Sequence, residues 1–291
     1  MARVLAFGVA VVDIVNVVRN YPEEDSEVRA LSQSIRRGGN ATNTLVVLSQ
    51  LGHHCSWSGT LAEDSDAKII LDDLLSYNIN TENIDVVTDG RTPVSYIIAS
   101  DNGSRTIVHY RNLPELQHGN VNIDRLSQFD WIHFEGRNIE ETAKIMKSMK
   151  SRYPQISISL ELEKPRKNIE SLIAYADHVM YSKQYMLSQQ FTDPELFLND
   201  QHLAFSDVDH YCSMGDKGVY GIGVEGILYC SEANNEIKVV DTIGAGDTLN
   251  AGLIHASLLQ LPMLKKLQVA CNLASRKCAQ YSFENLDVTG L

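Results

Sequence analysis

The sequence predicts an α/β fold in which helices cover both faces of a mostly parallel sheet, with a small β-sheet lid over the sheet's carboxyl edge. Along most of the 291 residues, short apolar segments of strand length alternate with amphipathic segments of helix length, as in βαβ units. Residues 3–12 are almost continuously apolar, which is typical of a central strand buried on both faces. The alternation is broken over residues 28–36 and 93–111, where strand-like segments follow one another, and these stretches form the expected lid.

Helical periodicity places the main helices. Residues 41–51 carry Leu45, Leu48 and Leu51 on one helical face and stop at Gly52, and residues 64–77 show a similar apolar stripe. Further helices are expected at 140–150, 168–175 and 249–279, the last interrupted at Pro262, and strands at 131–135, 156–162, 178–181 and 219–224. The alternation of these segments predicts one α/β core.

A hairpin is the clearest feature of the expected lid. Its strands, 93–100 and 105–111, flank the turn-like sequence Asp101-Asn102-Gly103-Ser104. Chain length and apolar content are enough for one large core with a small appendage. We therefore expect a single domain over residues 1–291, with a lid formed by segments at about 13–38 and 92–112.

Composition excludes several classes of protein. The formal net charge of −12, without any Lys/Arg-rich run, disfavours nucleic acid as a partner. The five cysteines are scattered and lack CxxC spacing, which indicates neither a disulfide framework nor a structural zinc site and fits a reducing cytosol. The N-terminus resembles neither a signal peptide nor a membrane span. A cytoplasmic protein without a membrane partner is expected.

The strongest functional signal is the sequence Gly244-Ala245-Gly246-Asp247, which opens an apolar helical pattern. Small residues let backbone N–H groups approach an anion, and a helix N-terminus adds the positive end of its dipole. An Asp in a first helical turn is also typical of simple dipole stabilisation, so the motif alone leaves both interpretations open. In a kinase, this carboxylate would accept the proton of the attacking hydroxyl while the N–H groups stabilise the transferring phosphoryl group.

A second set of polar residues lies near the N-terminus. Asn40 and Asn43 follow Gly39 and share one face of a helix start, where two amides can hydrogen-bond vicinal hydroxyls. Asn at a helix start is also a common cap. Asp13 is expected at the carboxyl end of the first strand, where open α/β sheets place ligand contacts, although a strand-end turn would also explain it.

Asp13, the pair Gly39-Asn40 and the distal sequence from Gly244 to Asp247 occur in one chain and in the order expected for a known superfamily. Through them the chain resembles the ribokinase and phosphofructokinase-B (PfkB) superfamily of carbohydrate kinases. Within the superfamily it is similar to the ketohexokinases, the hepatic-type fructokinases. The narrower resemblance rests on residues 24–29, 31–33, 37–40, 103–107, 131–133, 135–138 and 163–166. It covers nearly the whole chain, least strongly over 190–211 and after 279, and implies a ribokinase-like fold.

The resemblance implies roles at the sugar side of a site. Asp247 would be the base that takes the proton of the sugar's primary hydroxyl, and Gly244 to Gly246 would form the anion hole. The sugar hydroxyls would be held by four residues: Asp13, Gly39, Asn40 and Asn43. Because the lid resembles the β-clasp through which ketohexokinases dimerise, a homodimer is implied, with Asp25 touching the sugar in the partner's site.

Further residues are implied at the nucleotide side. Arg105 on the lid hairpin would reach the phosphates of ATP, although an isolated strand arginine is usually solvated. The turn Gly215-Asp216-Lys217-Gly218 would line the ATP site, where an ordinary hairpin is the alternative, and Lys183 would also face phosphates. ATP and Mg²⁺ are the implied cosubstrate and ion, and the resemblance allows a monovalent cation such as K⁺. The sequence assigns no metal ligands.

The leading hypothesis is transfer of the ATP γ-phosphoryl group to O1 of D-fructose, giving fructose 1-phosphate and ADP. A related superfamily kinase acting on ribose or a nucleoside is the alternative, and a non-catalytic sugar sensor is a third. A dinucleotide-dependent oxidoreductase is disfavoured, because the segment from Gly8 to Asp13 lacks the second and third glycines of a pyrophosphate-binding turn.

Overall fold

The computed structural model describes residues 1–100, 104–234 and 236–290, and it contains a main sheet of eight strands. Six neighbouring strands are parallel, and two antiparallel strands, β13 and β14, extend one edge. The strand order is β14 (Leu228–Ser231), β13 (Val219–Ile222), β12 (Asp209–Ser213), β11 (His178–Ser182), β10 (Ser157–Leu162), β9 (Trp131–Glu135), β1 (Arg3–Phe7), β4 (His54–Ser58). The predicted mostly parallel sheet is confirmed.

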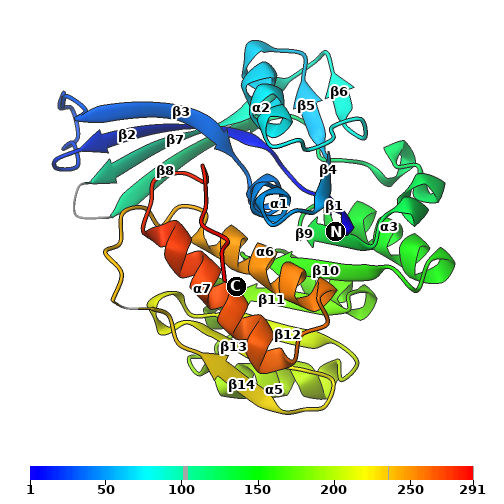
Figure 1. The fold of residues 1–291 in the computed structure, drawn as a ribbon. Coiled ribbons are helices and arrows are strands. Elements are labelled where there is room, and N and C mark those ends of the chain that lie inside the picture. Colours follow the sequence, from blue (N-terminus) through cyan, green and yellow to red (C-terminus); the bar gives the residue numbers. More distant parts are fainter. Residues whose placement is uncertain (101–103, 235, 291) are drawn as a thin grey trace.

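Helices lie on both faces of this sheet (Figure 1). The α-helices are α1 (Asn40–Gln50), α2 (Ser65–Ser76), α3 (Ile139–Arg152), α4 (Lys183–Ser188), α5 (Pro194–Ala204), α6 (Ala245–Leu258) and α7 (Met263–Cys278). Short 3₁₀ segments connect other elements: His118–Asn120, Ile123–Gln128, Ile169–Tyr175 and Gly215–Lys217. The segment expected as a helix over 168–175 is therefore a 3₁₀ turn.

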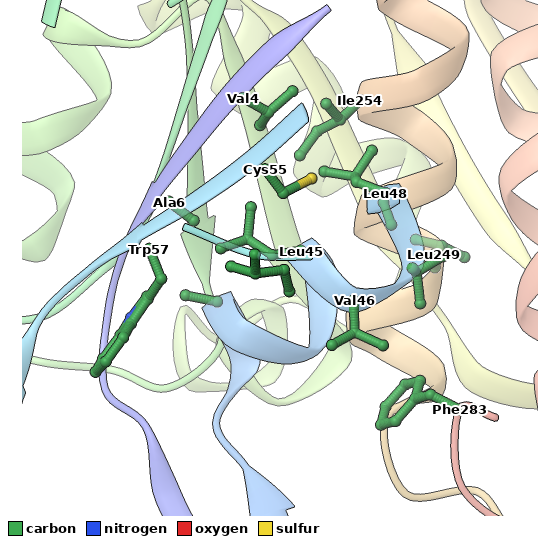
Figure 2. Close-up of a cluster of buried hydrophobic side chains, with 14 of the residues drawn as sticks. Val4, Ala6, Leu45, Val46, Leu48, Cys55, Trp57, Leu249, Ile254 and Phe283 are labelled. Atoms are coloured by element: carbon green, nitrogen blue, oxygen red, sulfur yellow. The ribbon is translucent and has the colours of Figure 1, made fainter. Parts of the chain in front are cut away.

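Strand β1 separates two hydrophobic cores. Val4 and Ala6 pack into one core with Leu45 of α1 and Ile254 of α6, as Figure 2 shows. Leu5 and Phe7 point to the other face, into a core shared with α3 and α5. Because successive strand residues face opposite sides, an apolar run is the sequence that burial on both faces requires. These cores fix the carboxyl ends of β9 and β10 beside the N-termini of α1 and α6.

A second sheet of four strands forms the lid, in the order β3 (Ser32–Gly38), β2 (Val11–Val18), β7 (Arg91–Ser100), β8 (Arg105–Asn112). It projects from the main body in Figure 1. Strands β7 and β8 are antiparallel, as the hairpin pattern predicts. The turn residues Asp101, Asn102 and Gly103 lie outside the described residues. A two-stranded parallel sheet, β5 (Thr60–Ala62) and β6 (Asp85–Val87), is a small additional element.

Two boundaries differ from the sequence prediction. Residues 3–12 are not one strand, because β1 ends at Phe7 and the chain enters the lid as β2 at Val11. The change of direction is accompanied by close packing at Gly8, where an added Cβ would lie 2.5 Å from the Ala41 Cβ. Strand β3 begins at Ser32, so residues 28–31 are not part of it.

The lid strands are in a register that places specific side chains in rows. Asp13 lies opposite Arg36 on β3 and Ser95 on β7, and Ser95 lies opposite His109 on β8. Directly paired residues share one face of a sheet, so this row points to a single side of the lid. Three of the four, Asp13, Ser95 and His109, line the cleft between the lid and the main sheet.

The first long helix, α1, begins with a conformation that needs glycine. Gly39 precedes α1 with φ of 111°, and an added Cβ would lie 2.1 Å from the carbonyl oxygen of Val9. No side chain caps this helix start. Glycine therefore lets the first turn of α1 approach the chain that leaves β1. Among the described residues, no helix is long and apolar enough to span a membrane.

Candidate active site

A cleft of about 430 Å³ lies between the lid and the carboxyl edge of the main sheet. Its lining comes from the lid, from the ends of β9, β10 and β11, and from the first turns of α1 and α6. Of the sequence-predicted site residues, the cleft brings together Asp13, Gly39, Asn40, Asn43, Arg105, Gly244, Gly246 and Asp247. Ligand sites at the carboxyl ends of parallel strands are the rule in open α/β folds.

The N-terminus of α6 forms the part of the cleft suited to an anion. Gly244 caps the helix with φ of 82°, and an added Cβ there would lie 2.2 Å from the Phe283 ring. The Ala245 N–H bonds to the Thr242 carbonyl oxygen, and Ala245 does not line the cleft. Gly246 and Asp247 line it, and among the described residues their N–H groups have no hydrogen-bond partner. These two N–H groups and the helix dipole can hold a phosphoryl group.

Asp247 is a buried carboxylate at this helix start, with 7% of its surface exposed. Asn43 donates a hydrogen bond of 2.6 Å to its Oδ2 atom. Burial raises the pKa of Asp247 to about 7, with help from the negative charges of Glu163 and Glu135, while the Asn43 hydrogen bond and Arg37 oppose the rise. A carboxylate with this pKa can accept a proton near neutral pH and release it again.

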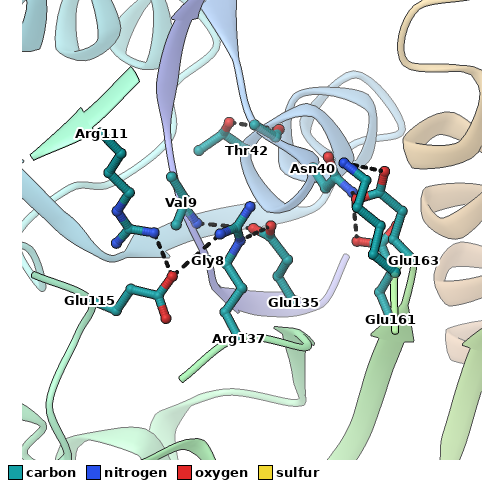
Figure 3. Close-up of polar contacts among 12 residues, drawn as sticks. Gly8, Val9, Asn40, Thr42, Arg111, Glu115, Glu135, Arg137, Glu161 and Glu163 are labelled. Carbon is teal, nitrogen blue, oxygen red and sulfur yellow. Dashed lines mark hydrogen bonds and ion pairs between the residues drawn. The ribbon is translucent and has the colours of Figure 1, made fainter. Parts of the chain in front are cut away.

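The two asparagines of α1 do different things. Both polar atoms of Asn43 have protein partners, because its Oδ1 accepts from Arg37 Nη1 at 2.7 Å while its Nδ2 donates to Asp247. Asn40 Nδ2 donates to Glu161 at 3.2 Å and Glu163 at 3.1 Å, as Figure 3 shows. Among the described residues, Asn40 Oδ1 accepts no hydrogen bond, so it is available to a ligand in the cleft.

Three glutamates in the cleft were missed by the sequence reasoning. Glu135 ends β9, Glu161 lies near the end of β10, and Glu163 follows it. Burial raises the pKa of Glu161 well above its usual value, and the nearby carboxylates of Asp247, Glu163 and Glu135 add to this. Asn250 of α6 donates to Glu161 at 3.0 Å. The rule applied to Asp13, that ligand contacts follow strand ends, would have found all three.

Asp13 reaches the cleft from the lid and not from the end of the first strand. It is the third residue of β2, and the chain leaves β1 at Phe7. Burial raises the pKa of Asp13, against a hydrogen bond with Ser95 and the positive charges of Arg36 and Arg37. The sequence therefore predicted a residue that does line the cleft, but it placed Asp13 on the wrong sheet. Consequently, any contact of Asp13 with a ligand depends on the position of the lid.

A chain of alternating charges connects the lid to the end of β9. Arg111 of β8 pairs with Glu115, which lies 3.3 Å from Arg137, and Arg137 pairs with Glu135 at 2.5 Å. Glu135 Oε2 then accepts the N–H of Val9 at 3.0 Å (Figure 3). Since Val9 lies between β1 and β2, this chain holds the base of the lid against the main sheet.

Asp241 joins the lid to the loop before α6. Its carboxylate lies 3.3 Å from Arg36 of the lid and 3.2 Å from Lys277 of α7, and it accepts the Ile243 N–H at 2.9 Å. Although burial acts to raise the pKa of Asp241, these partners hold it below its usual value. Arg105, from the opposite edge of the lid, donates to the next residue, Thr242, at 3.1 Å. Two lid arginines thus contact the segment that leads into the first turn of α6.

Other predicted residues lie outside the lining of the cleft. Asp25 is exposed in the loop between β2 and β3. Lys183 is the exposed first residue of α4, next to the cleft residue Ser182. The turn at Gly215–Lys217 is exposed, two residues beyond the cleft residue Ser213, whereas Gly218 is buried. These positions border the cleft or lie away from it.

No metal ligands were predicted from the sequence. Among the described residues, no group of three or more His, Cys, Asp or Glu side chains is arranged to hold a metal ion. The cleft nevertheless offers carboxylate oxygens from Glu135, Glu161 and Glu163, which is the donor type that Mg²⁺ prefers.

Comparison with known proteins identifies the class to which this fold and cleft belong. Residues 1–286 match the pfkB family carbohydrate kinases. The chain is 35% identical to ketohexokinase from Mus musculus, over 98% of both chains. It is 25% identical to an ATP-dependent ribose-1-phosphate kinase from Halopiger xanaduensis, over 93% and 90%, and 24% identical to ribokinase from Bacillus subtilis, over 95% and 91%. The protein is therefore a sugar kinase, a phosphotransferase.

Solved structures agree on the fold. Ribokinase from Thermotoga maritima superposes with a TM-score of 0.80 at 18% identity, covering 97% of this chain and 94% of that one. Arabidopsis thaliana ribokinase complexed with ribose and ATP gives 0.82 at 17% identity, with coverage of 97% and 94%. The expected ribokinase-like fold is confirmed. The chain belongs to the pfkB family of carbohydrate kinases, and within that family it resembles ketohexokinase.

We expect Lys277→Met to lower both stability and activity. Lys277 is fully buried, and its Nζ also donates to the Asp241 carbonyl oxygen at 2.9 Å, so removing the ammonium leaves a largely buried carboxylate short of a partner. Breaking such a pair costs about 3 kcal/mol. Chemical denaturation would measure the free energy of unfolding.

The matched control is Lys265→Met, an exposed lysine on the same helix, which should change the free energy of unfolding little. Equal stability losses in the two variants would contradict the role assigned to the Asp241–Lys277 pair.

Proposed function

We propose that this kinase transfers the γ-phosphoryl group of ATP to the 1-hydroxyl of D-fructose, giving fructose 1-phosphate and ADP. The observation that carries the proposal is the buried carboxylate of Asp247 beside two N–H groups at the start of α6 that have no partner among the described residues. A base and an anion-binding turn in one cleft are what phosphoryl transfer to a hydroxyl requires. The similarity to mouse ketohexokinase supports fructose as the acceptor.

In the proposed reaction, the sugar O1–H donates its proton to Asp247 while O1 forms a bond to the γ-phosphorus. The bond from the γ-phosphorus to the bridging oxygen breaks, and ADP leaves with those electrons. The N–H groups of Gly246 and Asp247 hold the charge on the transferring group, and the Gly244 to Gly246 turn keeps the backbone open for it. Because the pKa of Asp247 is about 7, the base is available near neutral pH.

The sugar is proposed to lie between the lid and α1. Asp13 offers a carboxylate and Asn40 a free amide oxygen, both acceptors for sugar hydroxyls. Gly39 keeps the first turn of α1 close without a side chain in the way. In this structure Asn43 contributes to the sugar site through its hydrogen bond to the base, since both its polar atoms are engaged.

The nucleotide is proposed to lie on the side of the cleft that contains the α6 turn. Arg105, Lys183 and the segment 215–218 are the proposed contacts, with cleft residues Ser182 and Ser213 next to two of them. Mg²⁺ bound to the ATP phosphates would neutralise their charge. A monovalent cation such as K⁺ is proposed as an additional cofactor.

Acidic side chains outnumber basic ones in the lining of the cleft. Asp13, Glu135, Glu161, Glu163 and Asp247 line it, against Arg105, Arg137 and Lys164. This excess supports an uncharged sugar over a sugar phosphate such as the ribose 1-phosphate in the name of one relative. The lid side of the cleft offers aliphatic Val11, Ile97 and Ile107 beside His109, and among the described lid residues no Phe, Tyr or Trp lines the cleft to stack on a nucleobase.

Kinase turnover should be selective for fructose and should depend on Asp247. A coupled ADP-release assay with Mg·ATP would compare fructose, ribose, adenosine and fructose 6-phosphate, and NMR would identify the phosphorylated carbon. Asp247→Asn should lower kcat by about 10²-fold or more, because the general base is lost. The control Asp207→Asn, an exposed carboxylate outside the cleft lining, should keep turnover unchanged.

Preferred turnover of ribose or adenosine would favour the alternative of a related superfamily kinase. Full activity of Asp247→Asn would refute the assignment of the base. Sugar binding without ADP release in the native protein would favour the non-catalytic sensor.

We also propose that residues 1–291 form a single domain. Its lid is proposed to mediate a homodimer. Ile35, Tyr96 and Val108 are exposed, and their register with Ile14 of β2 places them in one row across one face of the lid. An apolar row of this kind is typical of an interface. Asp25, exposed in the loop between β2 and β3, would then contact the sugar in the partner's cleft.

We expect the native protein to sediment as a dimer and Val108→Lys to shift it to a monomer, because the new charge would be buried at the lid interface. Analytical ultracentrifugation measures this, and Val224→Lys, at an exposed position on the main body, is the matched control. A native monomer at assay concentrations, or an unchanged Val108→Lys dimer, would overturn the interface.

A further inference from the structure

Arg37 is a buried cation that no role described above requires. It lies near the end of β3, two residues before Gly39, and only 5% of its surface is exposed. Arg37 Nη1 donates to Asn43 Oδ1 at 2.7 Å and to Thr42 Oγ1 at 2.9 Å, and Nε lies 2.5 Å from Asp73 of α2. A buried guanidinium is costly unless its donors are engaged, and these contacts engage it on two sides.

The contacts form a continuous path from the protein surface to the proposed base. It runs from Asp73 through Arg37 and Asn43 to Asp247, with the last hydrogen bond 2.6 Å long. A guanidinium only donates hydrogen bonds, so it fixes which end of the Asn43 amide faces it. With the amide oxygen held by Arg37, the amide nitrogen must point at Asp247 Oδ2. Among the described residues, the other oxygen of Asp247 has no partner, so it is free for a sugar hydroxyl.

We infer that Arg37 is a positioning residue for the reaction. Acting through Asn43, it orients the Asp247 carboxylate and favours its charged form, while Asp73 moderates that effect by partly neutralising Arg37. This inference rests on the proposed role of Asp247 as the base and adds a device that sets the pH range in which the base works.

The charges around Asp247 support the inference that Arg37 favours its charged form. Burial favours the protonated carboxyl of Asp247, and so do the negative charges of Glu163, which follows β10, and Glu135 at the end of β9. Arg37 is the cation that acts on Asp247 in the opposite direction, together with the Asn43 hydrogen bond. Substrate does not need to touch Arg37 for the effect, because Arg37 is not part of the cleft lining.

Two substitutions should move the pH profile in opposite directions. In Arg37→Gln the charge that favours the ionised base is lost, so the acid limb of kcat/KM should move up by about one pH unit. In Asp73→Asn, Arg37 loses its counter-charge, so the limb should move down by roughly half a unit. Arg37→Lys keeps the charge but loses the fork, so it should keep the limb near its native pH while kcat falls.

The matched control is Asp72→Asn, which removes the same charge from an exposed neighbour on α2 and should leave the profile in place. Profiles would be measured with whichever sugar the native enzyme turns over best, so the choice of sugar does not affect the test. Asp73 is more exposed than Arg37, so Asp73→Asn and Arg37→Lys keep the inference testable if Arg37→Gln does not fold.

Opposite shifts for Arg37→Gln and Asp73→Asn, with none for Asp72→Asn, would support the inference. Lower kcat with an unmoved limb in Arg37→Gln and in Asp73→Asn would overturn it and assign Arg37 a purely structural role. If Asp247→Asn retained full activity, the proposed function would fail instead, so the two failures are distinguishable.

Discussion

The burial of Asp247 at the start of α6 is the constraint on which the rest of the site depends. A charged carboxylate is costly in such a place, and the helix dipole, the Asn43 hydrogen bond and Arg37 offset the cost in part. Neighbouring glutamates act against ionisation, so the carboxyl changes its charge near neutral pH. Packing of α1 against α6, held by the core around Leu45 and Leu249, brings Asn43 and Asp247 together. The hydrophobic core therefore holds Asn43 within hydrogen-bonding distance of Asp247.

The lid takes part in the same arrangement. Arg36 and Arg105 come from its two edges and contact Asp241 and Thr242, the residues that lead into the first turn of α6. Asp13 lies on the cleft face of the lid, directly opposite Arg36. In the proposed reaction, the position of the lid would therefore couple a sugar at Asp13 to a phosphoryl group at the start of α6.

The sequence was sufficient for the mostly parallel character of the main sheet and for most helices, because these depend on local periodicity, but β4, β12 and β14 were not predicted. It placed Asp13 on the wrong strand, since the break after Phe7 occurs within a continuous apolar run and depends on contact between Gly8 and α1. Helix α5 was not predicted, although Asp193 followed by Pro194 is a local signal for the start of a helix. The path from Arg37 to Asp247 joins residues far apart in the chain, so no pattern in one sequence reveals it.

The most direct test of the central claim is the free energy of unfolding of the native protein and of Asp247→Asn between pH 5 and pH 8. The folded-state pKa of about 7 lies above the value of 3.8 for a free aspartate, so between these values the folded state binds the extra proton. Stability of the native protein relative to Asp247→Asn should fall as pH rises to about 7 and then level off. A difference that does not change with pH would contradict the account.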